Sequence, residues 1–302
     1  MSPRGRMIDI GGRRLRLVAA GPDADAAARG TPTVLLEAGA FGFSADWGVV
    51  QDRLAAAGLR SLAYDRAGLG LSDAAAGPRD GEAILSDLER LLEAAGEPPP
   101  YIAVGHSMAG LRVQLLAARH PDWISGVVLV DASTPDATQA PIGRRYLRAF
   151  ALASRLFSHL GGVGLLRPFA RHGDRIGLSG EARAEKLRIF PLPGHNRAAN
   201  AEVMLWMAAA KQARAAGTYN PATPLAVVTA GLAAPGHPVK AMMTAPARAA
   251  AVSYVKHVKG ARHATLLGSA FADEIVAAIL VVRDAAKTKA AGSPRRPSKN
   301  SN

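Results

Sequence analysis

The sequence predicts an α/β protein with a mostly parallel, eight-stranded sheet covered by helices on both faces. Short runs rich in Val, Ile and Leu alternate with amphipathic stretches, and glycine-rich loops follow several of these runs. With 49% apolar and 20% charged residues, the 302-residue chain can bury a full core. Repeated strand–helix units favour parallel strands with right-handed crossovers. In such sheets ligands bind at the carboxyl ends of the strands, so we expect chemistry in the loops that follow them.

The strands are predicted from short aliphatic and β-branched runs bounded by turn residues. The first two, 7–11 and 14–19, form a hairpin turned at Gly11-Gly12. The others are expected at 33–36, 59–64, 101–104, 127–130, 225–229 and 252–258. The run 127–130 is apolar throughout, as is typical of a strand buried on both faces.

Helices are predicted between these strands. Ile84, Leu88, Leu91 and Leu92 follow helical spacing, and Gly96 ends that helix. Others are expected at 45–57, 108–119 and around 271–279. Between residues 133 and 223 the alternation gives way to helical pieces such as 145–160 and 198–215. The predicted organisation is therefore a core of residues 1–132 and 224–283, a helical cap of residues 133–223 inserted after the sixth strand, and a disordered basic tail of residues 284–302.

Composition excludes several chemistries. The chain has no Cys, which excludes disulfides, thiolate metal sites and a Cys nucleophile. No group of His, Asp and Glu has the spacing of a metal site, so we expect neither a metal nor a cofactor. No stretch approaches the roughly 18 apolar residues of a membrane span, and the charged N-terminus has no apolar segment behind it. These observations predict a soluble, cytoplasmic protein.

The formal net charge of +13 is concentrated at the two ends of the chain. Residues 1–16 and 283–302 account for +9 of it. A basic tail binds polyanions weakly, and we expect no specific nucleic-acid partner. The cap interleaves large apolar residues with arginines, which suits a lid over a substrate pocket and, as the alternative, weak contact with a membrane surface. The sequence gives no oligomeric state.

One loop carries a motif for nucleophilic catalysis. Gly105-His106-Ser107-Met108-Ala109-Gly110 lies between a predicted strand and a predicted helix. Small residues around a serine in this context allow the strained turn called the nucleophile elbow, which exposes the hydroxyl. The second small position of the motif holds Ala109 instead of glycine. The alternative role for Ser107 is that of an ordinary helix N-cap.

Four segments together resemble the serine-type α/β-hydrolases of the lipase, esterase and proline-iminopeptidase-like group. They are Leu36-Glu-Ala-Gly-Ala-Phe-Gly42, Asp65-Arg-Ala-Gly-Leu-Gly-Leu-Ser-Asp73, the Ser107 elbow and Gly260-Ala-Arg-His263. The resemblance runs from about residue 7 to residue 283. It implies the α/β-hydrolase fold and a Ser-His-Asp triad that works without a cofactor. The segment 65–73 does not have the spacing of a phosphate-binding loop, and we interpret it as a structural turn near the site.

The resemblance places the triad base after the last strand, where His263 stands, with His237 as the rival. The acid usually follows the strand 225–229, but residues 203–262 contain no Asp or Glu. Some members carry it one strand earlier, and Asp131 directly follows the strand 127–130. Asp131 would orient the imidazole, with Asp136 as the back-up. The alternative is that Asp131 merely caps a turn.

Acyl transfer also needs donors for the developing oxyanion. The resemblance implies the backbone N–H of Met108 and one from Ala40 or Phe41, with Gly39 and Gly42 allowing close approach of that loop. The sequence therefore predicts a serine hydrolase that cleaves an ester, or less readily an amide, of a small to medium apolar substrate. The competing interpretations are a non-catalytic ligand-binding protein on a hydrolase scaffold and an acyltransferase, carbon–carbon hydrolase or peroxidase that uses the same site.

Overall fold

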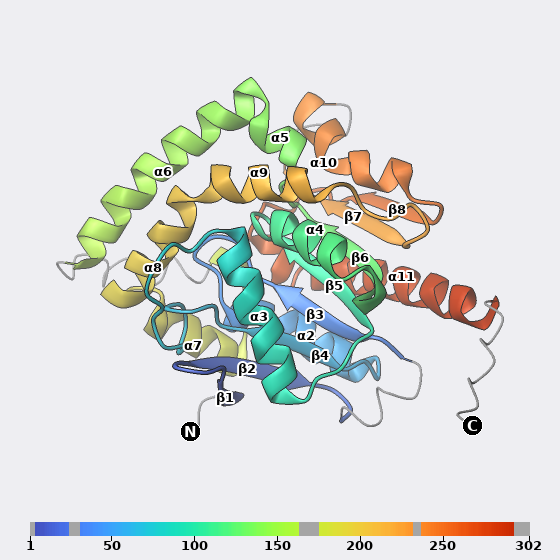
Figure 1. The fold of residues 1–302 in the computed structure, drawn as a ribbon, viewed down its shortest axis with the longest axis horizontal. Helices are drawn as coiled ribbons and strands as arrows, with labels where there is room; N and C mark the ends of the chain where they lie inside the picture. Colours follow the sequence, from blue (N-terminus) through green and yellow to red (C-terminus); the bar gives the residue numbers. More distant parts are fainter. Residues whose placement is uncertain (1–3, 24–30, 163–174, 232–236, 293–302) are drawn as a thin grey trace, which may run out of the picture.

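The computed structural model describes residues 4–23, 31–162, 175–231 and 237–292. Its centre is an eight-stranded sheet with the order β1-β2-β4-β3-β5-β6-β7-β8 (Figure 1). β2 pairs antiparallel with β1 and β4, and the other neighbours are parallel. The strands are β1 (Arg6–Asp9), β2 (Arg14–Ala20), β3 (Thr33–Glu37), β4 (Ser61–Tyr64), β5 (Tyr101–His106), β6 (Ile124–Val130), β7 (Leu225–Thr229) and β8 (Ser253–His257). The predicted mostly parallel, eight-stranded sheet is confirmed.

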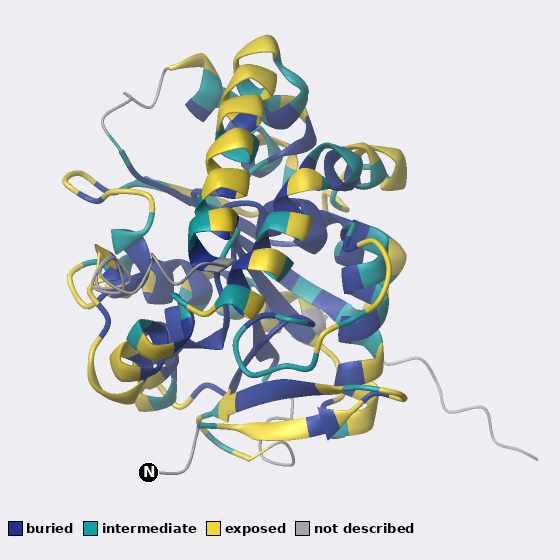
Figure 2. Ribbon diagram, turned by 90° about the vertical axis from the view of Figure 1, so that its left-hand side faces the viewer, coloured by how far each residue is buried: buried dark blue, intermediate teal, exposed yellow. Residues whose placement is uncertain are grey.

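Helices cover both faces of the sheet, because successive strand residues point to opposite sides. Val34 and Leu36 face the layer that contains α2 (Gly48–Ala56) and α11 (Ala272–Gly292). Leu35, between them, faces the layer that contains α3 (Gly81–Ala95), α4 (Ala109–Arg119) and α10 (Pro238–Ala249). Figure 2 shows the central strands in the colour of buried residues. Two separate apolar cores therefore hold the sheet, one on each face.

Local signals set the ends of several helices. The Asp80 carboxylate accepts a hydrogen bond from the Ala83 N–H at the start of α3, and Gly96 ends that helix with a φ of 68°. A short 3-10 helix (Ser44–Trp47) leads into α2. In the same way, the hydroxyl of Thr134 accepts from the Ala137 N–H at the start of α5 (Pro135–Gln139). The ends of α2 and the Gly96 end of α3 agree with the predicted positions to within a few residues, and α5 was not predicted.

In its described part, the segment between β6 and β7 contains helices joined by loops and no strand. It contains α5, α6 (Pro141–Gly162), α7 (Gly180–Ile189), α8 (Pro193–Met204) and α9 (Trp206–Ala216). The helix predicted at 198–215 is interrupted at Leu205, where α8 ends and α9 begins. Buried ion pairs attach α7 and α8 to the core: Glu185 pairs with Arg16, and Glu202 with Arg66. These contacts fix the cap relative to the sheet.

The C-terminal prediction was partly wrong. The sequence placed a disordered tail at residues 284–302, but α11 continues to Gly292. Residues 285–291 are Ala, Lys and Thr, mostly good helix formers, and they extend a helix that the core already holds. Residues 293–302 lie outside the described part of the chain. Within the described ranges, no helix combines the length and apolarity needed to span a membrane.

Candidate active site

Ser107 lies at a sharp turn between β5 and α4. Its φ of 58° is in the left-handed region that non-glycine residues rarely adopt. Two backbone hydrogen bonds hold this strained conformation. The Ser107 N–H donates to the Val130 carbonyl at 3.1 Å, and the Ser107 carbonyl accepts from the Ser133 N–H at 2.8 Å. The structure therefore has the strained strand–turn–helix geometry that the motif predicts.

Close packing explains which residues around Ser107 must be glycine. A Cβ on Gly105 would lie 2.9 Å from the Val113 side chain, and one on Gly110 would lie 2.5 Å from the Ser133 carbonyl oxygen. Ala109 is fully buried and its methyl group is accommodated. The tightest approach falls on Gly110, one residue beyond the usual motif position. This placement accounts for the alanine at position 109.

Asp131 and His263 meet beside this turn. Asp131 directly follows β6, with a φ of 42°, and its Oδ2 lies 2.7 Å from Nδ1 of His263. Its other oxygen, Oδ1, accepts hydrogen bonds from the Ala230 N–H at 3.2 Å and from Nζ of Lys240 at 2.5 Å. Asp136, the back-up acid, instead forms an exposed ion pair with Arg214. The rival base His237 caps α10 through a hydrogen bond from the Val239 N–H.

Lys240 is the neighbour of this site that sequence reasoning missed. It lies on α10, its side chain is buried, and its ammonium pairs with the acid that contacts His263. Burial alone would raise the pKa of Asp131, but the hydrogen bonds and positive charges of His263 and Lys240 outweigh it and hold that pKa well below its usual range. Asp131 is therefore ionised throughout the pH range in which proteins are normally studied.

His106 supports the loop that carries His263. Its Nε2 lies 3.0 Å from the His263 carbonyl oxygen, and the two ring centroids are 4.6 Å apart. Burial, together with the His263 charge, lowers the pKa of His106 to about 3. The ring is therefore neutral, and the Nε2–H donates to the carbonyl. Because His106 precedes Ser107 in the chain, this hydrogen bond holds the backbone of His263 close to the serine.

The predicted oxyanion loop lies against Ser107. The Gly42 N–H donates to the Gly39 carbonyl at 3.1 Å, which closes a turn with Ala40 and Phe41 at its tip. A Cβ on Gly39 would come within 2.8 Å of the Ser107 Cβ. Across the described residues, the amides of Ala40, Phe41 and Met108 have no protein acceptor. Free amides next to a serine are what an oxyanion site requires.

Comparisons with known proteins agree with this geometry. The family model described as the alpha/beta hydrolase fold matches residues 32–156, a range that includes β3, the oxyanion loop, the elbow and Asp131. Over this range the chain matches the α/β-hydrolase family. An "AB hydrolase superfamily protein" of Gibberella zeae is 35% identical over 120 residues, which are 38% of this chain and 37% of that protein. The chain thus spans well under half the length of the first curated relatives it matches.

Solved structures show the α/β-hydrolase fold over nearly the whole chain. The epoxide hydrolase CorEH has a TM-score of 0.67 at 19% identity, covering 91% of this chain and 97% of that one. A thermophilic esterase from Thermogutta terrifontis has a TM-score of 0.63 at 18% identity, covering 93% of this chain and 100% of that one. At these identities the likeness concerns the fold.

Buried arginines hold the predicted oxyanion loop in place. The Arg66 guanidinium donates to the carbonyls of Ala38 and Gly39, each at 2.9 Å, and also pairs with Glu202 of α8. Arg112, from α4, donates to the same Ala38 carbonyl at 2.6 Å. Both arginines also contact the buried Glu37. The segment 65–73, interpreted from sequence as a structural turn, thus connects the oxyanion loop to the cap.

Ser107, Asp131 and His263 line one pocket of about 370 Å³ under the cap. Its other walls are mostly apolar and come from α5, the start of α6, the start of α9 and α10: Ala132, Ser133, Ala137, Thr138, Ile142, Gly143, Tyr146, Leu147, Trp206, His237, Val239, Lys240 and Met243. Among the described residues no hydrogen bond joins the Ser107 hydroxyl to the His263 ring. Catalytic hydrogen bonds of this kind often tighten only when substrate binds.

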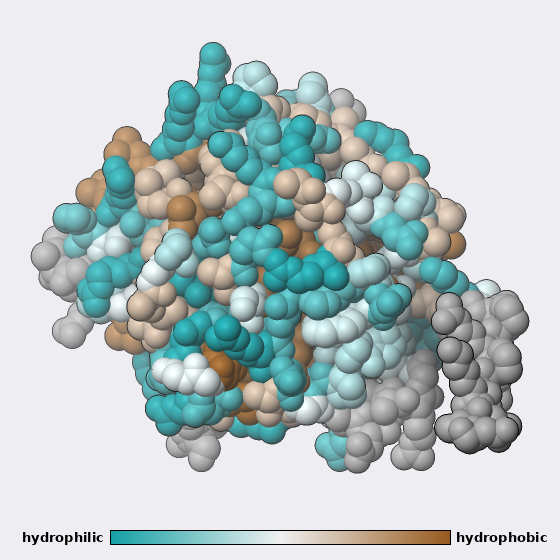
Figure 3. Space-filling model, in the orientation of Figure 1, coloured by the Kyte–Doolittle hydropathy of each residue, from teal (hydrophilic) through white to brown (hydrophobic). Residues whose placement is uncertain are grey.

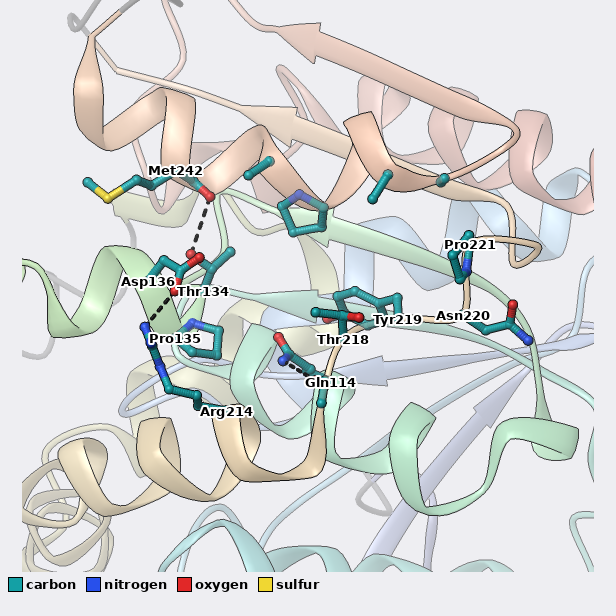
Figure 4. A pocket seen from close by; sticks show the side chains of 15 residues that line it. Gln114, Thr134, Pro135, Asp136, Arg214, Thr218, Tyr219, Asn220, Pro221 and Met242 are labelled. Atoms are coloured by element: carbon teal, nitrogen blue, oxygen red, sulfur yellow. Dashed lines mark hydrogen bonds and ion pairs between the residues drawn. The ribbon is translucent and has the colours of Figure 1, made fainter.

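A second pocket, of about 360 Å³, lies on the other side of α5 and α10 (Figure 4). Its lining includes Gln114, Tyr219 and the exposed Asp136–Arg214 pair. The Gln114 amide donates to the Ala213 and Gly217 carbonyls, so its polar group is already used within the protein. This pocket holds none of the three predicted triad residues. Nor do the described residues contain a group of His, Asp and Glu that could hold a metal ion.

Proposed function

We propose that the protein is a cofactor-independent serine hydrolase that cleaves carboxylic esters through a Ser107–His263–Asp131 triad. The observation that carries this proposal is the 2.7 Å contact between Asp131 and Nδ1 of His263, in the same pocket as a serine held at a nucleophile elbow. The carboxylate accepts a hydrogen bond from Nδ1–H, which keeps the proton on Nδ1 and leaves Nε2 free to act as a base. The comparisons support the scaffold, and the geometry of the site supports the proposed reaction.

In the proposed mechanism the Ser107 hydroxyl attacks the ester carbonyl while Nε2 of His263 takes its proton. The negative charge that develops on the carbonyl oxygen is stabilised by the amide of Met108 and by that of Ala40 or Phe41. The imidazolium, stabilised by Asp131, then gives its proton to the leaving alcohol, and an acyl-enzyme forms. A water molecule, deprotonated by His263, releases the acid and restores Ser107.

The pocket walls favour a small to medium apolar acyl or aromatic group. Its volume of about 370 Å³ lies at the lower end of the range for small-molecule sites. Ile142, Leu147, Trp206 and Met243 supply apolar surface around the nucleophile. Amides of the same shape would be poorer substrates, since their leaving group is more basic.

The test is hydrolysis of p-nitrophenyl acetate, butyrate, octanoate and laurate by the full chain and by Ser107→Ala and His263→Ala. We expect turnover of the shorter esters by the wild type, a loss of about 10⁴-fold or more in kcat in each variant, and unchanged circular dichroism. An Asp136→Asn variant is the matched control for the acid and should keep wild-type rates. Turnover that persists in folded Ser107→Ala would contradict the proposal. Folded wild type without turnover would favour a ligand-binding protein.

A further inference from the structure

The longest cap helix carries apolar residues on the side that faces solvent. Figure 1 places α6 at the outer edge of the molecule, and Figure 2, which views that side, shows it largely exposed. Ile142, Tyr146, Leu152 and Leu156 are 53%, 59%, 71% and 62% exposed and share one face of the helix. We call these four residues the α6 stripe.

The inner side of α6 is partly polar. Ser154 and Ser158 are buried on it, and the Ser154 hydroxyl donates to the Asn200 side-chain oxygen of α8 at 2.9 Å. The same inner side also packs Leu147 and Phe150 against the core. A surface helix normally has one apolar stripe, which faces the core, whereas α6 has a second one that faces solvent. Contiguous exposed apolar surface of this kind marks an interaction site.

Arginines accompany the stripe. Residues 141–162 include Arg144, Arg145, Arg148 and Arg155 and contain no Asp or Glu. Arg145, Arg148 and Arg155 are exposed, and in the part of the chain that the structure describes they form no ion pair. Figure 3 shows hydrophobic and hydrophilic side chains next to each other along the upper left edge, where α6 lies. The surface of α6 is therefore both apolar and cationic.

The positive charge is a property of the whole cap. Residues 133–223 hold 13 Arg and Lys against five Asp and Glu. Two of those five acids, Glu185 and Glu202, are buried in ion pairs with core arginines and add no negative charge to the surface. The core, residues 1–132 and 224–283, holds 19 Arg and Lys against 18 Asp and Glu. The cap is thus strongly basic, whereas the core is almost neutral.

The α6 stripe is continuous with the entrance of the candidate active site. Ile142 and Tyr146 belong to the stripe and also line the pocket of Ser107. An apolar molecule that left a lipid layer beneath α6 would meet these two side chains before it reached the nucleophile.

We propose that α6 docks on an anionic phospholipid surface, with the α6 stripe in the headgroup layer and the arginines beside lipid phosphates. Apolar side chains flanked by Arg on one helix are typical of such interfacial helices. A second copy of this chain is disfavoured as the occupant, since pairing through α6 would bring two acid-free rows of arginine together. A nucleic acid would pair with the arginines but would leave four large apolar side chains uncovered. The idea that this surface delivers substrate to Ser107 rests on the proposed function. The docking of α6 on lipid does not depend on it.

The test is flotation of the full chain with vesicles of phosphatidylcholine alone and of equal parts phosphatidylcholine and phosphatidylglycerol. We expect binding to the anionic vesicles only. Leu152→Ser with Leu156→Ser should weaken it by about 10-fold or more, and Arg148→Gln with Arg155→Gln by roughly 30-fold. None of these four residues lines the pocket of Ser107, so hydrolysis of a soluble short ester should not change.

Controls separate this proposal from its competitors. The matched control is Val252→Ser with Val255→Ser, which removes two exposed valines far from α6 in the sequence. Val252 precedes β8 and Val255 lies on it, and this variant should bind vesicles like the wild type. Ser107→Ala should bind vesicles like the wild type, whatever its activity. Vesicle binding that is equal in the wild type and both α6 variants would overturn the proposal and would assign the binding to other basic segments. The proposal would also be overturned if the wild type bound no vesicles and formed a dimer in light scattering that the Leu152→Ser with Leu156→Ser variant dissociates.

Discussion

Replacing Asp131 by asparagine tests how the carboxylate orients His263. Oδ1 of Asp131 receives two donors, Nζ of Lys240 and the Ala230 N–H, while Oδ2 faces Nδ1 of His263 at 2.7 Å. An asparagine amide has only one acceptor oxygen, and the two donors select the Oδ1 position for it. The NH₂ group then faces Nδ1, so the imidazole must place its proton on Nε2 and cannot accept the proton of Ser107.

The expected loss in kcat is on the order of 10⁴-fold, the scale of a wrong histidine tautomer in a serine triad. Stability changes as well, because Lys240 is buried and loses its counter-ion. Breaking a buried ion pair by removing one partner costs about 3–5 kcal/mol of unfolding free energy. The double variant Asp131→Asn with Lys240→Met removes both charges, so we expect it to regain much of this stability while remaining inactive.

The assay measures kcat/KM for p-nitrophenyl butyrate per mole of folded protein, with urea unfolding of each variant in parallel. Asp136→Asn changes a carboxylate only five residues away that pairs with exposed Arg214, and it should alter the rate less than about twofold. If kcat/KM fell by less than about tenfold in both folded Asp131 variants, Asp131 would not set the tautomer of His263.

Three further changes probe the surroundings of the site. Gly39→Ala puts a methyl group 2.8 Å from the Ser107 Cβ. Steady-state kinetics should show a kcat lowered by about 100-fold with a small change in KM. An unchanged kcat would show that the loop does not lie against Ser107. Arg66→Met leaves the buried Glu202 without a partner and should lower the unfolding free energy in urea by about 3–5 kcal/mol; a loss under about 1 kcal/mol would contradict this. Burial lowers the pKa of His195 to about 3, so the unfolded chain binds a proton near pH 6.5 that the folded chain does not, and stability falls as the pH drops below that value. Between pH 7.5 and 4.5 the His195→Gln variant should therefore lose about 2–3 kcal/mol less than the wild type in urea titrations, and equal losses would disprove the assignment.

The sequence predicted those features that local pattern controls. The strands, the glycine that ends α3 and the turn at Ser107 all leave signals within a few residues of the chain. The family resemblance pointed to His263 and Asp131, since it implies after which strands the base and the acid stand, and the carboxyl ends of parallel strands meet at one edge of the sheet. Their contact was still an inference, since 132 residues separate them in the sequence.

The features that sequence reasoning missed are long-range ion pairs. Lys240 contacts Asp131 across 109 residues, and Arg66 contacts Glu202 across 136. Neither cation lies in a motif that specifies its partner, and the pairing arises only when the cap and α10 fold onto the sheet. The lack of any Asp or Glu in residues 203–262 was the one available signal near Lys240, and it indicated only where the acid is absent.

Labelling with a fluorophosphonate, followed by peptide mapping, tests the central claim most directly. The reagent modifies only a serine that a neighbouring base activates. We expect one adduct per chain on the peptide that contains Ser107, strongly reduced in His263→Ala and absent in Ser107→Ala. An adduct on a different residue, or folded wild-type protein that remains unlabelled, would contradict that claim.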